Sequence, residues 1–153
     1  MSSPRDDLVE LFDYAWQRFN DRMDGLSDAE WGWEPVSDDR ITLRWRLGHI
    51  AELLQADRNG PWLGLAAGPG GGLSAAADSA AASLWELNVA YARWRAQLTE
   101  TTDESLGELI GPAAGPYADA TRRAFALHIV DEVIHHTAEA ALLRDLYAAT
   151  SHG

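Results

Sequence analysis

Hydrophobic residues recur at intervals of three and four along most of the chain, which is the spacing of one face of an α-helix. Two short helical turns are expected, at residues 27–30 and 103–110. No segment alternates between apolar and polar residues over the length of a strand, so the fold class is predicted to be all-α, a four-helix bundle. The long helices are predicted at about residues 4–23, 42–59, 79–99 and 119–149.

The connection between the second and third long helices is unusually rich in Gly, Ala and Pro, over residues 60–77. Such a composition predicts a long, irregular link. It is either a flexible crossover or a lid over a pocket, in which case Trp62 and Leu65 would cover the ligand. The whole chain, residues 1–153, is expected to form one domain, with a frayed tail over residues 148–153.

The last long helix carries apolar residues on two opposite sides. Such a helix either lies at the centre of its fold or contributes one side to a contact between subunits. Because each helix of a four-helix bundle keeps one side outward, we expect a homodimer formed through this helix. The second apolar side consists of Leu127, Val130, Ile134, Ala138 and Ala141.

Glu132 and His136 lie four residues apart on the last helix, bracketed by apolar residues on the same stripe. We expect both to be buried, and a buried carboxylate needs a partner that neutralises it. A divalent metal is one candidate, with His49 of the second helix as the third ligand. Two imidazoles and one carboxylate match a zinc site and equally a non-haem iron site. The alternative is a buried hydrogen bond between Glu132 and His136 without any metal.

Several other polar residues of the last helix could assist such a site. His128 and His135 lie on a neighbouring flank with Glu139, where they would either orient the ligands or face solvent or an interface. Arg144 could hold an anionic group of a substrate or form a salt bridge. Tyr147 could line a pocket or belong to the core.

The charge and composition of the chain exclude several functions. The formal net charge is −12, from 24 acidic and 12 basic residues, so binding to nucleic acid or to an anionic membrane is not expected. The chain contains neither Cys nor Lys, which excludes cysteine nucleophiles and lysine Schiff bases. It has no apolar run of about 18 residues, so we expect a soluble, cytoplasmic protein.

Three blocks of the sequence, taken in order, resemble the DinB-like (YfiT-like) superfamily of small bacterial four-helix metalloproteins. The resemblance implies that His49, Glu132 and His136 are metal ligands. Many relatives place His-x3-His on the last helix, and Glu132 stands where the first of these histidines would be. In this respect the chain is similar to the mycothiol-dependent maleylpyruvate isomerase branch, in which His, Glu and His hold zinc. The three blocks are residues 33–35 (Trp-Glu-Pro), 43–51 and 128–147.

The resemblance implies an enzyme that transfers or isomerises a small electrophilic substrate with the help of a low-molecular-weight thiol. Zinc is the expected metal, with nickel or iron as alternatives, and mycothiol is the expected co-substrate. The all-Arg, Ala-rich composition fits an actinobacterial source, in which mycothiol occurs. Two other functions stay open: a metal-dependent hydrolase that activates water at the same site, and a non-catalytic binding or stress-associated protein.

Overall fold

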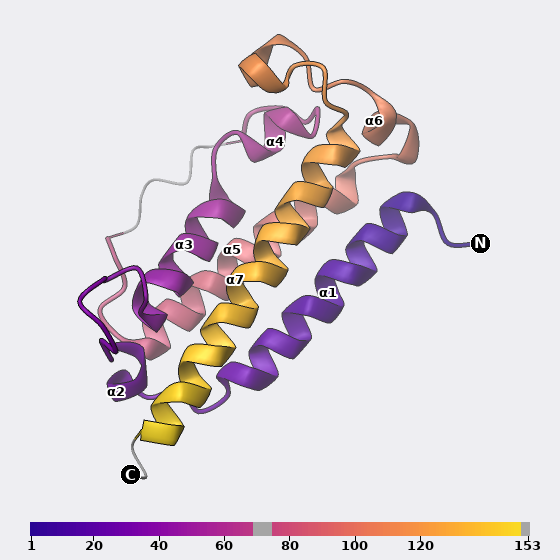
Figure 1. Ribbon diagram of the computed structural model, residues 1–153. Coiled ribbons are helices and arrows are strands. Elements are labelled where there is room, and N and C mark those ends of the chain that lie inside the picture. Colours follow the sequence, from indigo (N-terminus) through magenta and orange to yellow (C-terminus); the bar gives the residue numbers. More distant parts are fainter. Residues whose placement is uncertain (69–74, 151–153) are drawn as a thin grey trace.

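The computed structural model describes residues 1–68 and 75–150, and every regular element in these ranges is a helix (Figure 1). The predicted all-α fold is therefore confirmed. A single isolated bridge, between Leu109 and Thr121, is the one extended pairing among these residues. The four long helices are α1 (Pro4–Met23), α3 (Leu43–Gln55), α5 (Ala80–Glu100) and α7 (Arg122–Thr150). The short ones are α2 (Asp28–Trp31), α4 (Asn59–Trp62), α6 (Asp103–Gly107) and the 3-10 helix η1 (Pro112–Tyr117).

The four long helices form a bundle in which α1 and α3 lie on opposite corners. Each of these two helices packs against both α5 and α7. In Figure 1, α3 and α5 run in one direction, whereas α1 and α7 run in the other. Because α3 and α5 are parallel neighbours, the chain must travel back along the bundle between them. This requirement accounts for the predicted long connection, whose centre, residues 69–74, lies outside the described residues.

The apolar faces that the sequence predicts form the core. The residues spaced at three and four along α1 and α3 are all buried: Leu8, Phe12, Ala15, Trp16, Phe19 and Met23 of α1, and Leu43, Leu47, Ile50 and Leu54 of α3. Trp94 of α5 is fully buried and joins three helices, since its ring lies 5.5 Å from that of Phe12 and 6.0 Å from that of Phe125. Trp16 stacks on Tyr91 with ring centroids 4.3 Å apart, which ties α1 to α5.

The second long helix is shorter than predicted, ending at Gln55 rather than near residue 59. The backbone leaves the helical region at Ala56, where ψ is 133°. The side chain of the buried Asn59 then donates a hydrogen bond of 2.9 Å to the carbonyl oxygen of Leu53. A carbonyl near the end of a helix lacks a backbone partner, and Asn59 supplies one while the separate helix α4 begins.

The last helix begins at Arg122, three residues later than predicted. The hydroxyl of Thr121 accepts a hydrogen bond of 3.0 Å from the backbone N–H of Ala124, as a helix N-cap does. The preceding residues are held in a turn by the bond from Ile110 N to the carbonyl oxygen of Ala120. At the other end α7 continues to Thr150, so residues 148–150 of the expected frayed tail are helical, and 151–153 lie outside the described residues.

The second apolar side of α7 is only partly free for a subunit contact. Val130 is buried within the protomer, and Ile134 and Ala141 pack against the core. Leu127, in contrast, is 49% exposed. Contacts of α7 with its neighbours within the bundle therefore explain why much of this side is apolar. The homodimer stays a prediction.

Arg144 joins the end of α7 to the end of α1 and to α2. Its Nε lies 2.8 Å from Oε1 of Glu30, and its Nη1 donates to the carbonyl oxygens of Arg22 and Asp24 at 2.8 and 2.6 Å. The carbonyls at the C-terminal end of a helix lack intrahelical partners, so the guanidinium satisfies groups that the helix leaves open. Of the two interpretations of Arg144, the structure shows the salt bridge.

The substitution Arg144→Ala is expected to lower the free energy of unfolding by about 1–3 kcal/mol, because it removes a charge-assisted pair and two carbonyl contacts in a partly buried position. The matched control is Arg40→Ala, which removes a local ion pair with Asp38 from a side chain that is 66% exposed and should lower the free energy of unfolding far less than Arg144→Ala does. Urea unfolding followed by circular dichroism measures both. Equal losses in the two variants would contradict a structural role for Arg144.

Candidate metal centre

The antiparallel packing of α3 and α7 brings together the three residues that the sequence selects. One possible ligand atom from each of His49, Glu132 and His136 lies within 4.8 Å of the other two. Nε2 of His136 is 3.2 Å from Oε2 of Glu132. The rings of His136 and His49 meet edge to face, with centroids 4.6 Å apart. Two neighbouring helices thus present two imidazoles and a carboxylate to a common point.

The expected burial of this pair was wrong for Glu132, whereas His136 is largely buried. The side chain of His136 is 12% exposed and that of Glu132 is 29% exposed, while His49 is half-buried. The fully buried positions of α7 beside them are Ile129 and Val133, which face the centre of the bundle. The three polar residues consequently lie at the rim of the α3–α7 seam, where a small molecule can reach them from solvent.

Trp45 holds the ring of His49 in place one helical turn away. The two rings stack nearly parallel, with centroids 4.8 Å apart and an angle of 12°. Burial lowers the pKa of His49, and the nearby His136 lowers it further, because both disfavour the imidazolium. The neutral imidazole is the form that binds a metal, so this environment suits a ligand.

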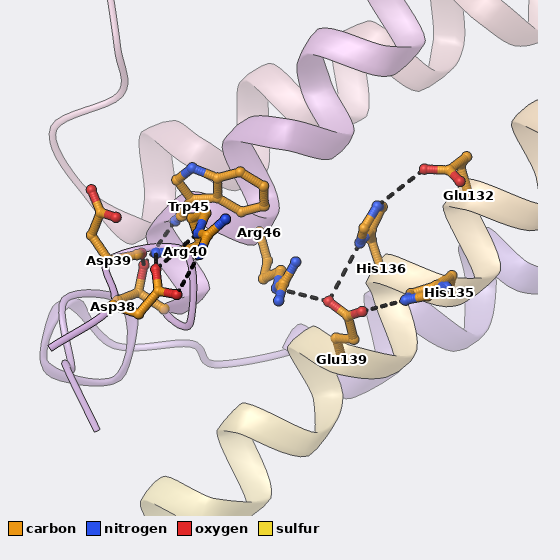
Figure 2. Close-up of polar contacts among 10 residues, drawn as sticks. Asp38, Asp39, Arg40, Trp45, Arg46, Glu132, His135, His136 and Glu139 are labelled. Atoms are coloured by element: carbon orange, nitrogen blue, oxygen red, sulfur yellow. Dashed lines mark hydrogen bonds and ion pairs between the residues drawn. The ribbon is translucent and has the colours of Figure 1, made fainter. Parts of the chain in front are cut away.

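Glu139, one turn after His135, supports His136 from the side opposite Glu132 (Figure 2). Its Oε2 lies 3.4 Å from Nδ1 of His136. The same oxygen is paired with Nε of Arg46 from α3 at 2.7 Å, and the other carboxylate oxygen contacts His135. A carboxylate that accepts the second N–H of a ligand histidine fixes the tautomer and the orientation of the ring. Glu139 is therefore placed to direct Nε2 of His136 toward Glu132.

The chemistry of this donor set fits a cation between His136 and Glu132. His136 faces a carboxylate with each of its two ring nitrogens. A neutral imidazole carries one N–H, so at one of these contacts a lone pair would face a carboxylate oxygen. A second proton or a metal ion removes that repulsion. With the Nδ1 proton directed to Glu139, the free lone pair on Nε2 is aimed at the point shared with His49 and Glu132.

A second group, formed by His135, His136 and Glu139, also brings three possible ligand atoms within 4.8 Å of one another. The guanidinium of Arg46 occupies one oxygen of Glu139 in this group. A fixed positive charge on a carboxylate opposes the binding of a cation to it. His135 is in addition 59% exposed, which lowers the benefit of ordering it around an ion. The geometry therefore favours the group that contains His49.

The remaining residues singled out from the sequence lie apart from this point. His128 is exposed, one turn before Glu132 on α7. Arg144 belongs to the contact with α1 and α2, and Tyr147 packs edge to face on Trp33 at 5.6 Å. Arg46 is the member of the cluster that sequence reasoning missed. Its position three residues before His49, on one face of the same helix, was the available signal.

Comparison with known families decides the classification. The model of the DinB superfamily matches residues 11–140. This chain belongs to the DinB superfamily. Comparisons with curated proteins and with solved structures find no match. Membership of this superfamily together with the His/Glu cluster, which could hold a metal ion, fits a metal-dependent enzyme.

No helix in the described part of the DinB chain is both apolar enough and long enough to cross a membrane.

In the metal-free protein, the imidazole of His49 is expected to titrate below its ordinary pKa of 6.5, because burial and His136 destabilise its protonated form. The unfolded chain then takes up this proton at a higher pH than the folded chain does. The contribution of His49 to stability is therefore lost as the pH falls from 6.5 toward the lowered value. Imidazole NMR resonances followed against pH measure the midpoint. A midpoint at or above 6.5 would contradict the described environment.

Proposed function

We propose that this DinB protein is a metal-dependent transferase or isomerase that uses a low-molecular-weight thiol, such as mycothiol, on a small electrophilic substrate. The observation that carries the proposal is the convergence of His49, Glu132 and His136 at the rim of the α3–α7 seam. Zinc is the proposed metal, because two histidines and one carboxylate form a typical catalytic zinc set with a position left for a ligand.

The residues around the three ligands have distinct tasks in this proposal. His49, stacked on Trp45, and His136, supported by Glu139, would supply neutral nitrogen ligands, and Glu132 would supply the negative charge. Arg46 pairs with Glu139 and holds it in place. When bound, the metal supplies a Lewis acid that lowers the pKa of a thiol and makes the thiolate available at neutral pH.

The chain contains no cysteine, which is consistent with the use of an external thiol. A protein without Cys has no sulfur nucleophile of its own, so a thiolate at this site must come from a small molecule. The partial exposure of Glu132 gives such a molecule access to the ligand cluster. The resemblance to the mycothiol-dependent branch, which also combines His, Glu and His, supports the same choice.

The substitution His49→Ala is expected to abolish tight zinc binding, because it removes one of three protein ligands. His135→Ala is the matched control: it removes a histidine of the second group, adjacent to a proposed ligand, and should leave zinc bound. The measurement is zinc content after dialysis, together with the rise in melting temperature that a metal binding only the folded form produces. The protein should be prepared without a nickel column.

The opposite pattern, with zinc retained in His49→Ala and lost in His135→Ala, would place the metal on the second group. Zinc absent from the unsubstituted protein, with an unchanged melting temperature on its addition, would refute the metal proposal. The contact between Glu132 and His136 would then be only a hydrogen bond within the helix, and the protein a non-catalytic one.

Turnover of small electrophiles by the zinc-loaded protein is expected to require an added thiol, because the chain carries none. The measurement compares the rate with mycothiol, with another small thiol and with no thiol. A strong dependence on thiol, lost in His136→Ala, supports the proposal. Turnover at the same rate without thiol would contradict it and would favour the metal-dependent hydrolase.

A further inference from the structure

A cavity of about 300 Å³ lies beside the first turns of α7, between this helix, α4 and η1. Its walls are aromatic: Trp62 of α4, Tyr117 of η1 and Phe125 of α7. The rings of Trp62 and Phe125 are 5.1 Å apart, and those of Trp62 and Tyr117 are 6.1 Å apart. The volume is at the lower end of the range for small-molecule sites, so a ligand here must be small. Aromatic walls favour one that is flat and apolar.

Arg58 gives this aromatic cavity a positive charge. Its guanidinium carbon lies 4.7 Å from the centre of the Trp62 ring and 5.9 Å from that of Phe125. Within residues 1–68 and 75–150, no carboxylate lies within ion-pair distance of Arg58, although the chain has 24 acidic residues against 12 arginines. A guanidinium without an acidic partner, held against aromatic rings, is suited to bind a carboxylate in its fork of N–H donors.

His128 connects the cavity to the proposed metal centre. It lines the cavity and precedes Glu132 by four residues on α7. Four residues of an α-helix rise about 6 Å, so the rim of the cavity is one helical turn from the ligand cluster and on nearly the same face. A flat molecule whose carboxylate rests on Arg58 can therefore extend past His128 toward Glu132.

We propose that this cavity is the substrate site and that it binds a small planar monocarboxylate, with Arg58 as the residue that recognises the carboxylate. This inference deepens the proposed function and rests on it, because a molecule bound here is a substrate only if the metal centre is catalytic. One negative charge is favoured over several, because the formal net charge of −12 repels polyanions and a single guanidinium faces the cavity walls. Trp62 and Phe125 would hold the flat body of the molecule, and its far end would face the metal centre.

The test is calorimetric titration of the metal-free protein with benzoate, and with benzamide as a neutral molecule of the same shape. Benzoate is expected to bind at least about tenfold more tightly than benzamide, because only the carboxylate forms a charge-assisted pair with Arg58. In Arg58→Gln, benzoate should bind about tenfold more weakly than in the unsubstituted protein, whereas benzamide should be unaffected.

Arg18→Gln is the matched control. Arg18 also lies over an aromatic ring, that of Tyr14 at 5.6 Å, and its loss changes the net charge by the same amount. Benzoate binding should not change in this variant. Equal affinities for benzoate and benzamide, the same loss in both arginine variants, or no binding of benzoate at all would each overturn the proposal.

The two proposals fail separately in this design. The titration uses metal-free protein, and its repetition in His136→Ala should give the same affinity for benzoate, because His136 does not line the cavity. Benzoate binding without zinc binding would therefore refute the metal-dependent function alone. Zinc binding without preference for benzoate would refute the carboxylate site alone.

Discussion

The candidate site depends on the antiparallel packing of α3 against α7. This packing sets the middle of one helix against the middle of the other, so that His49 meets His136 and, one turn further along, Arg46 meets Glu139. A shift of one helix by a single turn would move these side chains about 5.4 Å apart and separate both pairs. The buried residues of the seam, among them Leu47, Ile50, Ile129 and Val133, oppose such a shift because their packing is specific to this register.

The polar side chains at the rim form a chain in which a guanidinium and an imidazole alternate with carboxylates. Arg46 pairs with Glu139, Glu139 contacts Nδ1 of His136, and Nε2 of His136 faces Glu132. Each member limits what the next can do, since Arg46 keeps Glu139 available as an acceptor and Glu139 directs the lone pair of His136. These contacts order the ligand residues before any ion binds. They therefore reduce the conformational entropy that is lost on binding.

The position of the cluster at the rim also relates it to the aromatic cavity. His128, which lines the cavity, precedes Glu132 of the cluster by one helical turn, and α4, which begins after the break at Gln55, contributes Trp62 to the cavity wall. A second long helix continuing to residue 59 would have left no separate α4 to form this wall. The early end of α3, with Asn59 satisfying the carbonyl of Leu53, is thus a feature of the site as much as of the fold.

The sequence by itself determined the four helices, their buried faces, the long connection and the pair Glu132 and His136. These follow from local periodicity and from the spacing of side chains on one helix. The helix boundaries near residues 56 and 121 depended on hydrogen bonds between neighbouring turns and loops, such as those from Asn59 to Leu53 and from Ile110 to Ala120, which the apolar periodicity does not reveal. Only the tertiary structure decided that Arg46 reaches Glu139, that the ligand cluster lies at the rim rather than in the core, and that Arg58 covers an aromatic cavity. The physical reason is that each of these features depends on the distance and orientation between separate elements. The sequence of one helix specifies only which side chains share a face of that helix.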